Sequence, residues 1–154
     1  MGGGGQQQLQ QLSQELEAID EEIEELEREA NGLRTRQREV DEAIEAIETL
    51  DSGSTVQVPL GGGAYLRAEV QNIDEVIVGL GGGYAAEQDQ EGAIDALERK
   101  KGVLDDRIDD LQDEISELEA ESDEIEQQAQ QMQQQMQQQQ MQQMQEMQEE
   151  GDEQ

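Results

Sequence analysis

Residues 9–33, LQQLSQELEAIDEEIEELEREANGL, decide the fold because their apolar side chains recur at alternating steps of three and four. The series starts at Leu9 and Leu12 and continues to Ile47, with Gln37 as its polar interruption. A 3.5-residue repeat sustained over several heptads is the signature of a coiled coil. The apolar stripe is too narrow for one helix to bury by itself, so this helix requires a partner helix.

A second heptad series runs from Ile94 to Met136, with Lys101 and Ser122 as its polar interruptions. Two stripes of matched length predict that the chain folds back on itself as an antiparallel helix pair, in which a-type layers face d-type layers. A slip of one heptad would fit equally well. At 1.5 Å per residue the paired helices would be about 60 Å long. The expected register opposes Ile47 with Ile94, Leu33 with Ile108, Ala30 with Leu111, Leu16 with Ile125, and Leu9 with Met132.

Between the helices the apolar period changes to two, which is typical of β-strands. The glycine triplets 61–63 and 81–83 separate paired runs, and glycine supplies the positive φ that tight hairpin turns require. Asn72 marks the connection between the two hairpins. The expected strands are residues 55–60, 65–70, 75–80 and 84–88.

These patterns predict an α+β fold, a long antiparallel two-helix coiled coil with two β-hairpins inserted between the helices. The ends are of low complexity and we expect them to be disordered. The expected segments are a disordered Gly/Gln-rich stretch at 1–8, helix 1 at 9–51, the double hairpin at 52–90, helix 2 at 91–137, and a disordered Gln/Met-rich tail at 138–154.

The composition excludes several function classes. The 154 residues include no Phe, Trp, His or Cys, so a large aromatic core and disulfides are excluded. No residues combine a nucleophile, a base and an oxyanion donor, and we expect no enzyme activity, no cofactor and no metal site. With nine Lys and Arg against forty Asp and Glu, phosphate contacts to nucleic acid are not expected.

The net charge of -31 indicates an environment rich in salt. At about 1 M salt the Debye length falls to about 3 Å, which relieves repulsion between like charges. The alternative is an acidic chain that neutralises a basic partner. No apolar stretch is long enough to span a bilayer, and Met1 is followed by glycine and glutamine rather than by a signal sequence. We therefore expect a cytoplasmic protein of a halophile that does not act at membranes.

The hairpin sequences also resemble a known family. The runs Val58-Pro-Leu-Gly-Gly-Gly-Ala-Tyr65, Val76-Ile-Val-Gly-Leu-Gly-Gly-Gly83 and Ala93-Ile-Asp-Ala-Leu97 resemble the archaeal prefoldin alpha subunit. The resemblance implies a hexamer of two alpha and four beta subunits, joined through their hairpins. It also implies that non-native client proteins are held at the coiled-coil tips without ATP and are delivered to a group II chaperonin. The alternative is a coiled-coil structural or adaptor protein that oligomerises through its β insert.

Charge is absent from residues 1–14 and 127–145, which lie opposite each other in the expected register. Flexible methionines suit a surface that accepts many apolar partners. Residues 52–86 carry only three acidic side chains, so the hairpins suit contact between subunits. The expected client-binding residues are Leu9, Leu12, Met132, Met136, Met141 and Met144. The expected oligomerisation residues are Val56, Val58, Leu60, Leu66, Val70, Val76, Val78 and Leu80.

The crowding of like charges leads to a prediction about salt. Helicity and melting temperature should rise steeply between dilute buffer and about 1 M KCl, because ions screen the repulsion along both helices. Circular dichroism melts measure both quantities. An unchanged melting temperature across this range would contradict the halophilic interpretation of the charge.

Overall fold

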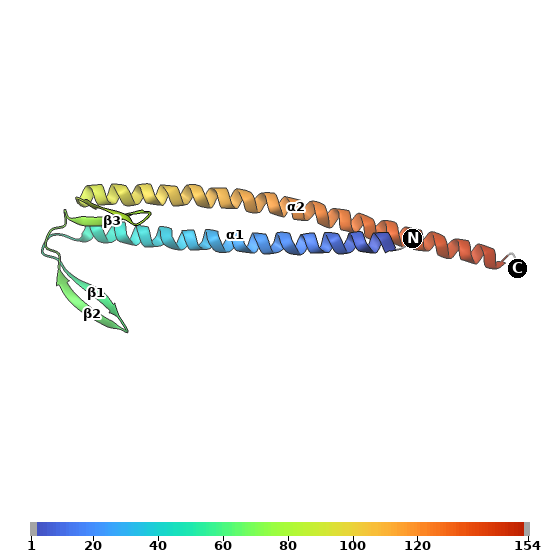
Figure 1. Ribbon diagram of the computed structural model, residues 1–154, viewed down its shortest axis with the longest axis horizontal. Helices are drawn as coiled ribbons and strands as arrows, with labels where there is room; N and C mark the ends of the chain where they lie inside the picture. The colour runs from blue at the N-terminus through green and yellow to red at the C-terminus, as the bar shows by residue number, and fades with distance from the viewer. Residues whose placement is uncertain (1–2, 153–154) are drawn as a thin grey trace. The chain divides into compact units, whose positions relative to one another are not determined.

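The computed structural model describes residues 3–152 and contains two long helices with four short strands between them (Figure 1). This confirms the expected fold class. Within the described residues, neither helix combines the length and the hydrophobicity that a bilayer span requires. The elements are α1 (Gly3–Thr49), β1 (Thr55–Gly61), β2 (Ala64–Glu69), β3 (Val76–Gly81), β4 (Tyr84–Gln88) and α2 (Gln90–Asp152).

The chain forms two compact units. The distal unit contains the residues up to Glu29 together with those from Leu111 onwards, and the hairpin unit spans Ala30–Asp110. In the distal unit the N-terminal part of α1 lies beside the orange part of α2, and the red end of α2 extends past it (Figure 1). The hairpin unit contains all four strands and the adjoining ends of both helices.

Burial along both helices follows the heptad pattern. In the distal unit Ile19, Leu111 and Ile125 are buried, and in the hairpin unit Val40 and Ile108 are buried. The residues between these positions are largely exposed. The polar interruptions also face the seam, because Gln37 and Lys101 are half-buried and Ser122 is buried. The narrow apolar stripe therefore forms the core of each unit, as the 3.5-residue repeat predicts.

Two seam interruptions are paired across the helices of the hairpin unit. The Lys101 Nζ lies 2.8 Å from the Asp41 Oδ1, and this hydrogen-bonded ion pair raises the pKa of Lys101. The Gln37 Nε2 donates a hydrogen bond to the Asp105 Oδ1. Both contacts give a half-buried polar seam residue a hydrogen-bonding partner on the opposite helix.

The structure differs from expectation at both ends of the chain. Helix α1 begins at Gly3, and α2 continues to Asp152, so the disorder expected for 3–8 and 138–152 is wrong. Glutamine, methionine and glutamate are good helix formers, and extending an existing helix requires no new nucleus. At the other end Gly5 packs against Met136, which stabilises a poor helix-forming stretch. Residues 1–2 and 153–154 of the expected disordered segments lie outside the described residues.

Each hairpin is its own two-stranded antiparallel sheet, β1 with β2 and β3 with β4. Both turns are built alike, since Gly62 and Gly63 have φ of 61° and 81°, and Gly82 and Gly83 have φ of 62° and 82°. Two consecutive positive φ values define the primed turn that matches the twist of a hairpin. The glycine triplets therefore serve the function that the sequence predicts for them.

Gln90, the first residue of α2, connects the helix ends to the loop between the hairpins. Its Nε2 donates to the carbonyl oxygens of Ile47 (2.8 Å) and Leu50 (3.2 Å), which are among the terminal carbonyls without a partner inside α1. Its backbone N–H donates to the Asp74 Oδ1 at 3.3 Å. Asp74 is itself held by the turn at Asn72, whose Oδ1 accepts the Asp74 N–H at 3.0 Å. One amide side chain thus ties together the end of α1 and the start of α2.

Replacing Gln90 with alanine tests this connection. We expect the free energy of unfolding to fall by about 1 kcal/mol, because the two side-chain hydrogen bonds to the end of α1 are lost. Thermal melts at constant KCl concentration measure the change, and Glu91→Ala is the matched control because Glu91 is an exposed neighbour in the same helical turn. Equal melting temperatures for the Gln90 variant and the control would contradict this assignment.

Candidate functional site

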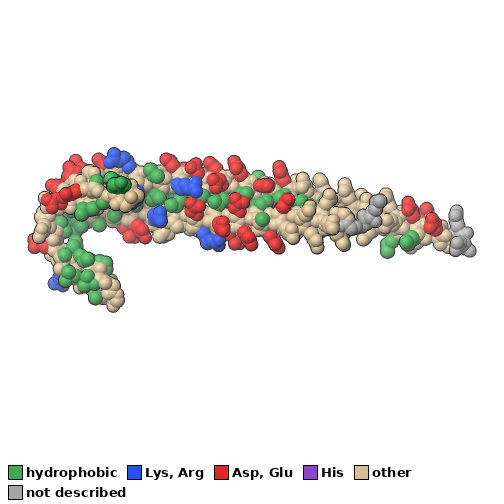
Figure 2. Space-filling view, viewed as in Figure 1, with side chains coloured by type: hydrophobic (Ala, Val, Ile, Leu, Met, Phe, Trp, Pro, Cys, Tyr) green, Lys and Arg blue, Asp and Glu red, His purple; other side chains and the backbone are tan. Residues whose placement is uncertain are grey.

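Acidic side chains cover part of the distal unit, are absent from the next stretch of both helices, and return on α2 only at Glu146. Residues 15–27 and 111–126 each carry eight Asp or Glu and no Lys or Arg. Residues 1–14 and 127–145 carry no charged side chain. Figure 2 shows this change on one face, where red acidic side chains give way to tan polar ones. The distal unit therefore combines an acidic surface with a neutral one on the same helix pair.

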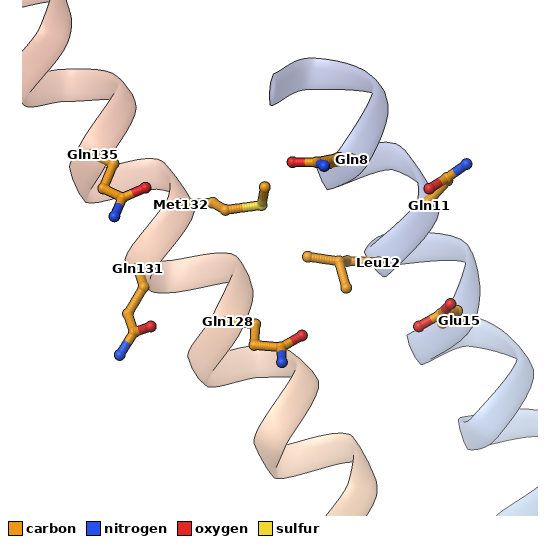
Figure 3. A pocket seen from close by; sticks show the side chains of 8 residues that line it. All are labelled: Gln8, Gln11, Leu12, Glu15, Gln128, Gln131, Met132 and Gln135. Atoms are coloured by element: carbon orange, nitrogen blue, oxygen red, sulfur yellow. The ribbon is translucent and has the colours of Figure 1, made fainter. Parts of the chain in front are cut away.

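A groove of about 390 Å³ opens on the neutral surface of the distal unit. Leu12 and Met132 point toward one another between the two helices, with Gln8 and Gln128 beside them (Figure 3). We call this feature the tip groove. It is lined by Gln8, Gln11, Leu12, Glu15, Gln128, Gln131, Met132 and Gln135.

The chemistry of the tip groove is apolar in its centre and neutral at its rim. Leu12 and Met132 supply apolar contact, and the methionine thioether adapts to differently shaped partners. Five of the eight lining residues are glutamines, each with two N–H donors and one carbonyl acceptor, and Glu15 is the only acid among them. The groove can therefore accept an apolar side chain and exchange hydrogen bonds with polar groups beside it.

The residues expected to bind clients lie in three different environments. Leu12 and Met132 line the tip groove, whereas Leu9 and Met136 are half-buried and do not line it. Met136 packs against α1, and a Cβ added at Gly5 would lie 3.1 Å from its Sδ. The remaining two candidates, Met141 and Met144, are 69% and 71% exposed on the end of α2.

The glutamines of the tip groove were missed by reasoning from sequence. The signal was present, since the acidic side chains stop at Glu15 and Glu126, but it was interpreted as an absence of charge alone. Heptad positions identify the seam, whereas Gln8, Gln11 and Gln131 lie outside the heptad stripe. Their placement around a shared groove depends on the register of the two helices, which the sequence left open by one heptad.

The hairpins carry the second candidate surface. Of the residues expected there, Val58, Leu60, Leu66 and Leu80 are exposed, whereas Val78 is only 5% exposed. Three further residues, Val56, Val70 and Val76, are half-buried. The sequence list omitted three large exposed side chains, Tyr65, Ile77 and Tyr84, which are 64–76% exposed. Alternation along the strands places Tyr65 and Ile77 on the faces opposite the listed residues.

The strand edges of both hairpins lack a partner strand within the described residues. All four strands lie at the edge of a two-stranded sheet. An isolated hairpin is marginally stable in water, and unpaired edges accept strands from other chains. Only three acidic side chains fall within residues 52–86, so another acidic chain can approach them. These features suit association through the hairpins.

Comparisons with known proteins agree with this architecture. Residues 19–142 match the family described as Prefoldin, prefoldin subunit. Prefoldin subunit alpha of Halorubrum lacusprofundi is 72% identical over 113 residues, which covers 73% of this chain and 74% of that protein. Prefoldin subunit alpha of Haloarcula marismortui is 64% identical over 107 residues, which covers 70% of each protein. Both organisms are halophilic archaea.

A solved structure is also similar. The cryo-EM structure of filamentous PFD from Methanocaldococcus jannaschii aligns with a TM-score of 0.50 and 26% sequence identity. The alignment covers 77% of this chain and 95% of that chain. The family match begins at residue 19, so the part of α1 that lines the tip groove lies outside it.

The contact between Gly5 and Met136 makes the helix register testable. The expected register assigns Met136 to Gly5, because these residues lie four positions beyond Leu9 and Met132. The chain has no cysteine, so a Gly5→Cys, Met136→Cys variant introduces one defined pair. We expect it to form an intramolecular disulfide readily, as measured by mass and by mobility on a non-reducing gel. Faster bridging in a Gly5→Cys, Ala129→Cys control would indicate that the helices are offset by one heptad.

Proposed function

We propose, because the chain belongs to the prefoldin family, that it is the alpha-type subunit of a chaperone that captures unfolded proteins at its helix tips without ATP. The observation that carries the proposal is the tip groove, which places Leu12 and Met132 within a neutral surface on an otherwise acidic helix pair. Delivery of the captured protein to a group II chaperonin and a cytoplasmic location belong to the same proposal.

The proposed mechanism is reversible hydrophobic capture with no covalent chemistry. An unfolded protein exposes apolar side chains, and burying them stabilises the complex by about 25 cal/mol per Å² of apolar surface removed from water. One groove of this size holds a single side chain or a small group of them. Several tips in one assembly would bind one client together, which raises the overall affinity far above that of a single tip.

The proposed assembly joins this chain to beta-type subunits through the hairpins, with two alpha and four beta subunits. Support comes from the exposed apolar side chains, among them Leu66 and Leu80, and from the open strand edges. Association would cover these side chains and pair the edges at once. The tips, which lie in the other compact unit, would remain available to clients.

Removing the apolar centre of the tip groove tests client capture. Leu12→Ser with Met132→Ser should weaken the suppression of aggregation of a denatured client several-fold, because the groove loses its apolar contacts. Light scattering of a diluted client measures the effect. Val103→Ser is the matched control, since Val103 is a 68% exposed apolar residue of α2 that does not line the groove.

The same variant separates a chaperone from a structural coiled-coil adaptor. Its native mass should equal that of the parent, and circular dichroism should show that the helices are intact. Unimpaired protection of the client by this variant would favour the adaptor, or would place capture elsewhere on the assembly.

Charge placed on the hairpin faces tests the assembly. Leu66→Asp with Leu80→Asp should prevent formation of the larger oligomer, because two exposed apolar side chains become anions within the proposed interface. Native mass spectrometry measures the number of subunits. Glu69→Gln with Glu87→Gln is the control on exposed strand positions that leaves the apolar faces unchanged. An undiminished oligomer in the Leu66, Leu80 variant would contradict the role of the hairpins.

A further inference from the structure

We propose that the tip groove binds the main chain of its client as well as apolar side chains, through the amides of Gln8, Gln11, Gln128, Gln131 and Gln135. This inference rests on the proposed function and specifies its substrate class. The ligand is an extended, unstructured polypeptide segment whose backbone N–H and C=O groups are free. Recognition of this kind does not depend on the client's sequence.

The first observation is that glutamine at the tip replaces the acidic residues found elsewhere on the same helix surfaces. Residues 15–27 and 111–126 carry acids at most of their exposed positions, whereas the neighbouring stretches 6–14 and 127–145 carry glutamine at most of theirs. Glutamate and glutamine have nearly the same shape and the same helix propensity. Helix formation therefore does not require glutamine in place of glutamate at these positions. Having glutamine there changes two properties of the surface, its charge and its supply of hydrogen-bond donors.

The second observation is the placement of the amides around the apolar centre. Gln8 and Gln128 lie beside Leu12 and Met132 in the space between the helices (Figure 3). Gln11 extends from α1, and Gln131 and Gln135 extend from α2. A client segment with one side chain between Leu12 and Met132 would meet the amides of Gln8 and Gln128 first, because Gln11 and Gln131 point away from the apolar centre (Figure 3).

Amides suit a polypeptide main chain better than carboxylates do. An extended chain presents N–H donors and C=O acceptors alternately, and a glutamine side chain pairs with either. A carboxylate accepts from N–H but repels C=O. Neutral hydrogen bonds are also insensitive to ionic screening, whereas ion pairs at a surface weaken as salt increases. With Glu15 as the only charged lining residue, such a groove keeps its affinity in concentrated salt.

A double comparison of protein and peptide tests the proposal. In the full chain in its assembled form, the five lining glutamines are changed to alanine, which favours helix. The control changes the same number of exposed glutamines that do not line the groove, Gln7, Gln10, Gln127, Gln130 and Gln134. The probes are a short uncharged peptide of alternating Leu and Ser with blocked ends, and the same peptide with N-methylated backbone amides. Fluorescence anisotropy in about 1 M KCl gives Kd.

The parent and the control should bind the unmodified peptide equally, and the groove variant about tenfold more weakly, as expected for the loss of a few neutral hydrogen bonds. For the N-methylated peptide, the groove variant should lose clearly less affinity than for the unmodified peptide, because the backbone N–H donors are blocked while the C=O acceptors remain. Changing the lining glutamines to glutamate should weaken binding more in dilute buffer than in KCl, since added anions repel the C=O groups.

Two results would overturn the proposal. One is an unchanged Kd of the groove variant for the unmodified peptide. The other is an equal loss for both peptides, which would show that the backbone N–H groups of the client make no contact with the lining amides. If Leu12→Ser with Met132→Ser still abolishes binding in either case, capture at the tip stands and only the main-chain recognition fails. If that variant binds like the parent, the proposed function fails as well.

Discussion

Repulsion between like charges is the constraint on which the rest of this structure depends. With a net charge of -31, the chain can bring two surfaces together only where acidic side chains are absent or paired. Three places meet this condition: the apolar seam between the helices, the hairpins, and the neutral tip. The seam holds the helix pair together, and the other two are the candidate surfaces for other proteins. Concentrated salt lowers the remaining repulsion, because it screens the acidic side chains that stay exposed.

The seam shows that a narrow apolar stripe is enough to hold two helices together when its heptad repeat is regular. Leu111 is fully buried and Ile19 nearly so, yet neither lies in a globular core. The polar interruptions Gln37 and Lys101 find partners in Asp105 and Asp41 on the opposite helix. Polar residues at seam positions can fix the register of a coiled coil. A fixed register matters here because it decides which side chains of α1 and α2 share the tip groove.

The sequence was sufficient to predict the helix pair, the four strands and the glycine turns, because each follows from a local period or from a required positive φ. It was insufficient in three respects. Helix extent at 138–152 was missed because low complexity was taken for disorder, although Gln and Met favour helix. The glutamines of the tip groove were missed because the heptad pattern describes only the seam. Likewise Val78 and Val58 occupy equivalent hairpin positions, yet only Val78 is buried, which no period along the chain reveals.

Hydrogen exchange measured on the assembled protein, with and without a bound unfolded client, tests the central claim most directly. In molar KCl, client binding should slow amide exchange around residues 5–15 and 128–136 and leave exchange in the acidic stretches 16–27 and 111–126 unchanged. Protection confined to the hairpins or to the acidic stretches, with none at the tip, would contradict the central claim.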